Sequence, residues 1–249
     1  MTRPLMLAAT LLVAHCLHAD ALGDLKGRLA TLKGADPVKA SVDYQTWSRT
    51  LEDKKPRIVQ GRATAWVEDG PQGLRLHWSR ALLQQAVQEA RARAQDPEKE
   101  TGTRSALRGI DPLEIGEKLN YAEALLREME EMQAQLQEER ADTFHGQPAK
   151  LLVLKAMPRM REDQRKAMKE FQATFRIWLG ADGLPLGCHS SVAFKASKFL
   201  IKFEGGNSEE VRLMRSGDRL VATSIVRESH GSGLGQQSQN KTTLTITLN

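Results

Sequence analysis

The sequence contains only two cysteines in 249 residues, Cys16 and Cys188. If the N-terminal segment is cleaved as argued below, Cys188 remains alone, and one thiol cannot form a disulfide within the chain. We therefore expect stability to come from an apolar core. A chain of this length can bury about 70% of the surface that its unfolded form exposes, which suffices for a core without covalent cross-links.

Residues that could form a catalytic or metal centre are also missing. The histidines show no metal-ligand spacing. Cys188 and His189 are adjacent, so in a strand they point to opposite faces and cannot act on each other as nucleophile and base. The glycine-rich residues 231–235 lack the strand-to-helix context of a phosphate-binding or nucleophile turn, and we expect a flexible hairpin loop there. We predict no catalytic residues, no metal ligands and no cofactor, and hence a protein that is not an enzyme.

A long apolar run is absent too. Residues 5–17 form an apolar stretch of about 13 residues, whereas a membrane-spanning helix needs roughly 20. Arg3 precedes the stretch, and Ala19-Asp20-Ala21 supplies the small-x-small pattern that signal peptidase requires. We predict a signal peptide over residues 1–21 and a periplasmic product. A buried N-terminal helix or short anchor is the alternative. Lipidation of Cys16 is less favoured, because His15 precedes it where bacterial lipoprotein signals place a small residue.

The charge is basic but dispersed. The net charge is +5, and the sequence pI is near 9.3, yet lysine and arginine alternate with acidic residues throughout. We predict a solvated basic surface capable of transient contact with a membrane surface, and no nucleic-acid partner. The acidic residues between positions 128 and 139 are expected to form a solvated helix face. They are Glu128, Glu130, Glu131, Glu138 and Glu139.

The first half of the mature chain mixes strand and helix patterns. Apolar spacing predicts a short helix over residues 22–32. Alternating residues predict strands at 38–49, 58–68 and 74–78, the last two forming a hairpin. Helical spacing returns at 81–94, a polar linker follows at 98–108, and a capping signature at Asp111-Pro112 begins a helix that runs to about residue 141. We treat residues 81–141 as a helical insertion.

From residue 150 the strand pattern returns. Short alternating segments separated by turns predict a meandering antiparallel sheet of about nine strands in total, which tends to curl. Turns are expected at residues 182–183, 205–207 and 217–218, and a helical connection at 159–172. The predicted fold is α+β, with residues 22–249 forming a single domain.

The four tryptophans are the candidate ligand-binding residues. Trp78 has the parity of an apolar strand face, whereas the other three share faces with polar residues. Such tryptophans line a groove, cover a sheet edge or pack under the helices, and the sequence leaves these alternatives open. Leu125 and Met129, on the apolar stripe of the long helix, complete the set of groove candidates. The set is Trp47, Trp66, Trp78, Trp178, Leu125 and Met129.

Two groups of residues resemble a known family. Val42-Asp43-Tyr44-Gln45-Thr46 and Gly61-Arg62-Ala63-Thr64-Ala65-Trp66-Val67 resemble the opening of the outer-membrane lipoprotein carrier (LolA-like) superfamily. Gly146-Gln147-Pro148-Ala149-Lys150 and Asp182-Gly183-Leu184-Pro185 resemble the second half of lipoprotein-sorting proteins of that group. The resemblance covers about half of the chain.

This resemblance implies a strongly curved, incomplete β-barrel with helices on its concave face and a cavity between them for acyl chains. In the carriers a functional arginine follows the tryptophan strand, but here Trp66-Val67 is followed by Glu68-Asp69-Gly70, which leaves the cargo open. The leading hypothesis is a periplasmic, non-enzymatic carrier or binding protein for a lipid-like or lipoprotein acyl ligand. The alternative is an envelope scaffold that uses the helix at 111–141 against a protein partner.

Overall fold

The computed structural model describes residues 21–52, 55–155, 162, 168–198 and 201–249. Within them the chain forms a ten-stranded antiparallel sheet and five helices, an α+β fold. The sheet is open rather than closed into a barrel, because β3 and β4 end the strand order. In chain order the elements are α1 (Ala21–Thr31), β1 (Val38–Glu52), β2 (Lys55–Asp69), β3 (Arg75–His77), α2 (Arg80–Gln95), α3 (Gly102–Arg108), α4 (Pro112–Leu119), α5 (Tyr121–Glu131), β4 (Gln135–Phe144), β5 (Gln147–Lys155), β6 (Met168–Leu179), β7 (Pro185–Lys198), β8 (Ile201–Ser216), β9 (Arg219–Gly233) and β10 (Gln236–Leu248).

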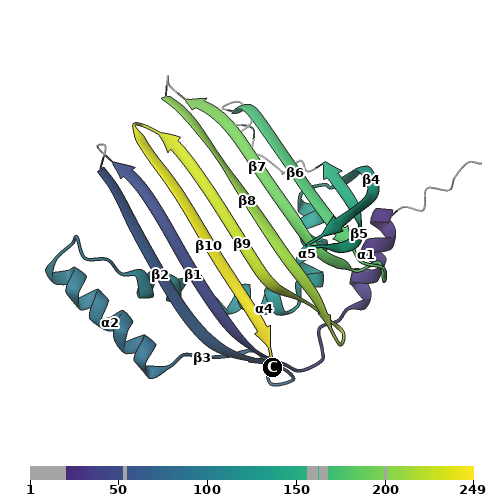
Figure 1. The fold of residues 1–249 in the computed structure, drawn as a ribbon, viewed down its shortest axis with the longest axis horizontal. Helices are drawn as coiled ribbons and strands as arrows, with labels where there is room; N and C mark the ends of the chain where they lie inside the picture. Colours follow the sequence, from purple (N-terminus) through teal and green to yellow (C-terminus); the bar gives the residue numbers. More distant parts are fainter. Residues whose placement is uncertain (1–20, 53–54, 156–161, 163–167, 199–200) are drawn as a thin grey trace, which may run out of the picture.

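The two halves of the chain meet inside the sheet. The strand order is β3-β2-β1-β10-β9-β8-β7-β6-β5-β4, so the first hairpin docks through β1 onto the last strand. The β1–β10 register runs from Ala40 opposite Leu248 to Leu51 opposite Gln237. The C-terminus therefore lies beside the start of β1 (Figure 1).

Successive side chains point to opposite sides of the sheet. We call the side that carries the buried residues Val42, Ile177 and Cys188 the inner face, and the opposite side the outer face. The inner face packs against the helices, and the core includes Leu25 of α1 and Leu125 of α5. The expected face of the first strand is confirmed, since Val38, Ala40 and Val42 are all buried.

The helices cover only one half of the inner face. Figure 1 shows α4 and α5 behind the half of the sheet where β10 ends, while the opposite ends of the long strands extend past them. The buried residues of β9 follow the same division, because 219–222 are buried whereas 226–233 are partly or fully exposed. The uncovered half is where the groove described below begins.

The expected helix from Asp111 to residue 141 is wrong. The chain forms α4, turns at Asn120, forms α5, and then becomes strand β4. The break lets both short helices bury their apolar faces on the sheet, and residues 135–144 gain hydrogen bonds by pairing with β5. The charges of Glu138, Glu139 and Arg140 suit an edge strand, which they protect from further pairing.

Five smaller expectations differ from the structure. The expected polar linker at 98–108 contains α3. Residues 168–172 of the expected helical connection belong to β6, and the remainder of that connection, 159–167, lies outside the described residues except for residue 162. The glycine pair at 205–206 lies inside β8 rather than in a turn. The flexible hairpin loop expected at 231–235 is a tight two-residue hairpin turn at 234–235 between β9 and β10. The described sheet has ten strands rather than about nine.

The helices at 22–32 and 81–94 are confirmed within one or two residues as α1 and α2. The signal peptide expected over 1–21 lies outside the described residues except for Ala21, where α1 begins. Among the described residues, none of the helices combines the length and apolar character that crossing a membrane would require.

Candidate functional site

The six predicted groove residues lie in different parts of the fold. By strand parity Trp47, Trp66 and Trp178 lie on the outer face. Trp66 is 60% exposed, whereas Trp178 donates a hydrogen bond to Asp142 at 3.1 Å and lies beside the ring of Phe144. The structure therefore does not gather the tryptophans into one groove.

The remaining three predicted residues belong to the packed core or its margin. Trp78 follows β3 and packs against the core, on the apolar face that its parity predicts. Leu125 and Met129 of α5 are fully buried between the helix and the sheet. Neither residue lines an open groove, because the space around them is filled by other core side chains.

An open groove begins where α5 ends, on the uncovered half of the inner face. Its volume is about 500 Å³. Glu128 and Met132 line it from the helical side, and Ala173, Val192 and Arg227 line it from the sheet. We call it the inner groove. It takes its shape from the way α5 stops short of the strand ends.

The floor of the inner groove changes character from row to row across the sheet. The last covered row is apolar and includes Ile177, Cys188 and Ile225. The next row is polar, because Ser190, Glu209, Arg227 and Thr242 stand side by side in neighbouring strands. In the row beyond it Ala173 and Val192 are apolar, whereas Asn207 and Ser229 are polar. Apolar side chains therefore return beyond the charged band mainly on the β6 and β7 side of the sheet.

Arg227 organises the charged band. Its guanidinium forms ion pairs with Glu209 on β8 and with Glu114 on α4, the latter at 3.1 Å. Burial lowers the pKa of Arg227, but the two carboxylates outweigh it, and the pKa lies above its ordinary value. Arg227 is therefore a permanent cation that links the sheet to a helix.

Glu128 is a partly buried carboxyl at the helical wall of the groove. Burial, reinforced by the nearby carboxylate of Glu209, raises the pKa of Glu128 to about 7, while Lys118 and Arg227 oppose the shift. The expectation that Glu128 belongs to a solvated face is wrong, because α5 turns this residue toward the groove. The neighbouring Glu130 is exposed as expected.

Beside the charged band, a tyrosine hydroxyl and a cysteine thiol form a buried hydrogen bond. The hydroxyl of Tyr121 lies 3.8 Å from the thiol of Cys188, and both side chains are buried. Burial raises the pKa of both groups above their ordinary values. A protonated, inaccessible thiol is a poor nucleophile, and Cys188 packs as a core residue.

Three phenylalanines form the apolar end of the inner face. Phe171 stands opposite Phe194 in the β6–β7 register, and Phe203 stands one row further on in β8. Glycines flank them, since a Cβ on Gly205 would lie 3.1 Å from the Phe194 ring and one on Gly233 would lie 2.6 Å from the Phe203 ring. The rings thus lean over glycine backbone. We call Phe171, Phe194 and Phe203 the phenylalanine shelf, and all three remain partly exposed.

The alternation of side chains along the strands is enough to assign the shelf residues to the inner face. Phe171, Ala173 and Phe175 alternate along β6, and Phe194 shares the parity of Val192 and Cys188. The sequence pattern hides the shelf, because residues 159–172 resemble a helical connection and residues 205–207 resemble a turn. The charged band was not foreseeable, because Glu114, Glu209 and Arg227 are far apart in sequence.

In the part of the chain that the structure describes, acidic residues, histidines and cysteine form no cluster able to hold a metal ion. Comparisons with known proteins add no assignment, because no family model matches the sequence and no curated protein matches it significantly. These comparisons do not bear on the resemblance to the lipoprotein-carrier superfamily, which rests on the sequence segments quoted above alone.

Proposed function

We propose that the protein is a non-enzymatic carrier or binding protein of the periplasm that holds a lipid-like ligand in the inner groove. The observation that supports this most directly is the sequence of rows on the uncovered inner face. A charged band at Arg227 and Glu209 gives way within two rows to the phenylalanine shelf. An amphipathic molecule has the same division into a polar and an apolar end.

The ligand lies with its chain along the phenylalanine shelf and its polar group at the charged band. Apolar area removed from water contributes about 25 cal/mol per Å², and Met132, Ala173 and Val192 extend the apolar surface toward α5. Tyr44, Ser190 and Thr242 offer hydroxyl groups beside the polar end. Ligand pockets commonly combine such an apolar lining with a few placed polar groups.

The proposal includes the finer architecture implied by the family resemblance. In it, the sheet curves around α4 and α5 as an incomplete barrel, with the helices on its concave face. The N-terminal residues 1–21 direct export and are removed. The filled space around Leu125 and Met129 then means that the ligand occupies the groove beyond α5 rather than the layer between helix and sheet.

The alternative of an envelope scaffold loses its proposed contact surface. That hypothesis needs a long helix at 111–141 with an exposed apolar stripe. The stripe residues Leu119, Leu125 and Met129 are buried in the core, and residues beyond 134 are in β4. We find no observation that favours it over ligand binding.

Titration with a dansyl-labelled fatty acid tests the proposal. We expect saturable binding, and we expect Phe194→Gln to weaken it at least tenfold, because the substitution removes a ring from the shelf. Lys195→Gln is the matched control, since Lys195 follows in the same strand, points to the outer face and pairs with Glu170 at the surface. Absence of binding to the wild-type protein, or equal binding by Phe194→Gln, would overturn the proposal.

A further inference from the structure

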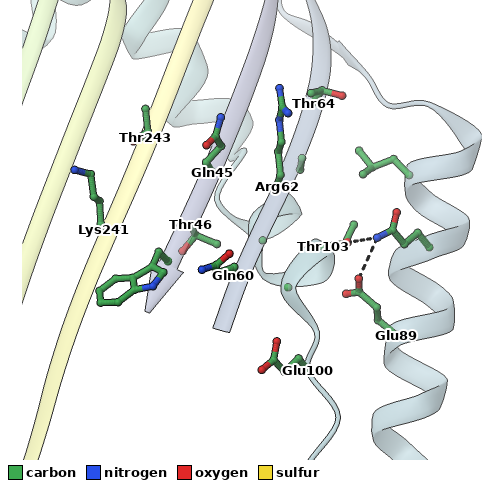
Figure 2. A pocket seen from close by; sticks show the side chains of 16 residues that line it. Gln45, Thr46, Gln60, Arg62, Thr64, Glu89, Glu100, Thr103, Lys241 and Thr243 are labelled. Atoms are coloured by element: carbon green, nitrogen blue, oxygen red, sulfur yellow. Dashed lines mark hydrogen bonds between the residues drawn. The ribbon is translucent and has the colours of Figure 1, made fainter. Parts of the chain in front are cut away.

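The outer face carries two grooves that the proposed function does not use. One has a volume of about 860 Å³ and lies between β1, β2 and helix α2. The other has a volume of about 850 Å³ and crosses the strands from β1 toward β6. Trp47 and Lys241 line both grooves. We call the combined surface the outer trough, and Figure 2 shows its α2 end.

Uncharged hydrogen-bonding groups dominate the outer trough. Gln45, Gln60, Thr64 and Thr243 line the α2 end, and their amide and hydroxyl groups lie along three neighbouring strands (Figure 2). Ser208 and Gln239 continue the pattern at the far end. Amides donate and accept at once, and hydroxyls do the same. Such a surface matches a ligand that presents many hydroxyl groups.

The main charges in the trough are paired with each other. Arg62 holds Asp43 through two hydrogen bonds of 2.9 and 2.8 Å, and the ammonium of Lys241 lies 2.7 Å from Glu228. An anionic ligand would have to break these pairs or compete with their carboxylates. The trough therefore favours a neutral ligand over a phosphate, a nucleic acid or an acidic peptide.

Trp47 gives the trough an aromatic surface among these polar groups. It stands between Gln60 on β2 and Lys241 on β10 in the strand register and remains partly exposed. The face of an indole carries negative charge density, and C–H groups of slight positive charge pack well against it. A sugar ring presents C–H groups on its face and hydroxyl groups at its edge.

Helix α2, which forms the wall of the trough, is held to α3 by hydrogen bonds, and α3 is held to β2 by close backbone packing. The side-chain amide of Gln85 on α2 donates to Thr103 on α3 at 2.7 Å, and Glu89 accepts from the backbone N–H of Arg104. α3 in turn lies directly on β2, where a Cβ on Gly61 would come within 2.0 Å of the Gly102 carbonyl oxygen. This chain of contacts sets the width of the trough before any ligand binds.

We infer that the outer trough is a binding site for a neutral oligosaccharide, with one sugar ring stacked on Trp47 and its hydroxyl groups bonded to Gln45, Gln60 and Thr243. The inference is independent of the proposed lipid site, because Trp47, Gln45 and Thr243 point to the outer face, away from the phenylalanine shelf. Such a site would let the protein bind a glycan in addition to the proposed lipid-like ligand.

Calorimetric titration of the wild-type protein with chitotriose, maltotriose and cellotriose tests the inference. We expect at least one trisaccharide to bind, Trp47→Ala to weaken binding at least tenfold, and Trp47→Phe to retain most of it. Trp66→Ala is the matched control, because Trp66 lies on the same face but outside the trough.

Three results would overturn the inference: no binding of any of the three sugars, unchanged binding by Trp47→Ala, or equal loss in Trp66→Ala. Phe194→Gln, which removes a ring of the proposed lipid site, should bind the sugar as tightly as the wild-type protein does. Sugar binding can therefore be observed even if the protein binds no lipid. Unchanged thermal unfolding of Trp47→Ala shows that a loss of sugar binding is local.

Discussion

Arg227 on β9 and Glu114 on α4 lie 3.1 Å apart, nitrogen to oxygen, and join a helix to the sheet at the point where the core ends. The same guanidinium pairs with Glu209 on β8. Arg227 therefore holds two carboxylates from two different elements, and Glu128 lines the same groove nearby. This arrangement marks the border between the packed half of the inner face and the open half.

Loss of Arg227 should cost more stability than loss of Glu114. Arg227→Leu leaves Glu209 and Glu114 without their cation, and we expect it to lower the free energy of unfolding by about 2 kcal/mol, below the cost of fully buried pairs because water reaches this site. Glu114→Gln breaks only a half-exposed pair and should cost about 0.5 kcal/mol. Urea denaturation measures both. Equal effects would show that Arg227 does not organise the band.

Glu128 should make stability depend on pH. Its pKa is about 7 in the folded protein against an ordinary value of 4.5, so the folded state holds a proton that the unfolded state releases. Relative to Glu128→Gln, the wild-type protein should be equally stable below pH 4.5 and progressively less stable up to about pH 7. The difference should reach about 2 kcal/mol above that pH, allowing for partial solvent access.

Urea denaturation at pH 4, 6 and 8 checks this prediction. Glu130→Gln is the control, since Glu130 lies on the same helix and is exposed; its stability should follow the wild-type protein at every pH. A constant difference between Glu128→Gln and the wild-type protein would contradict a raised pKa for Glu128.

Gly61 should tolerate no side chain. Gly61→Ala places a methyl group 2.0 Å from the carbonyl oxygen of Gly102, so α3 must move, and we expect a loss of about 3 kcal/mol. Gly27→Ala is the matched control. It lies in α1 with nothing within 4 Å of the added carbon and should stabilise by about 0.5 to 1 kcal/mol. Thermal unfolding separates the two. A neutral Gly61→Ala would contradict the close contact of α3 with β2.

The buried guanidinium of Arg219 is stabilised by its ion pair with Asp69. Arg219 is 3% exposed and pairs with Asp69 at 2.8 Å, while its Nε donates to the backbone carbonyl of Asp36. Asp69→Ala leaves a buried cation without its carboxylate and should cost about 3 kcal/mol or more. Glu68→Ala, one residue earlier, removes only a surface pair with Lys39 and should change stability by less than about 1 kcal/mol. A cost for Asp69→Ala no larger than that would contradict the role of the pair.

The strand pattern of the sequence predicts much of the sheet. Alternation places Val42 on the inner face, and the turn chemistry at 69–73 and 182–183 falls at observed turns. Alternation could not reveal that β1 pairs with β10, because that contact joins opposite ends of the chain. Nor could it separate α5 from β4, since apolar residues at helical spacing continue past the point where pairing with β5 takes over.

The candidate sites were harder to predict for the same reason. Tryptophans are natural ligand-binding candidates in a sequence, but three of the four lie on the outer face, where Trp47 lines the outer trough and Trp66 lies outside it. The phenylalanine shelf depends on register between β6, β7 and β8, and two glycines in it resemble a turn when read alone. Register across strands is a property of the whole sheet.

Native mass spectrometry of the full-length protein, expressed with its own N-terminal segment and purified from the periplasm, tests the central claim most directly. We expect a chain shortened by about 21 residues that carries a lipid adduct, and a much reduced adduct in Phe194→Gln but not in Lys195→Gln. A wild-type chain that is free of lipid, or an adduct that Phe194→Gln retains in full, would contradict the claim.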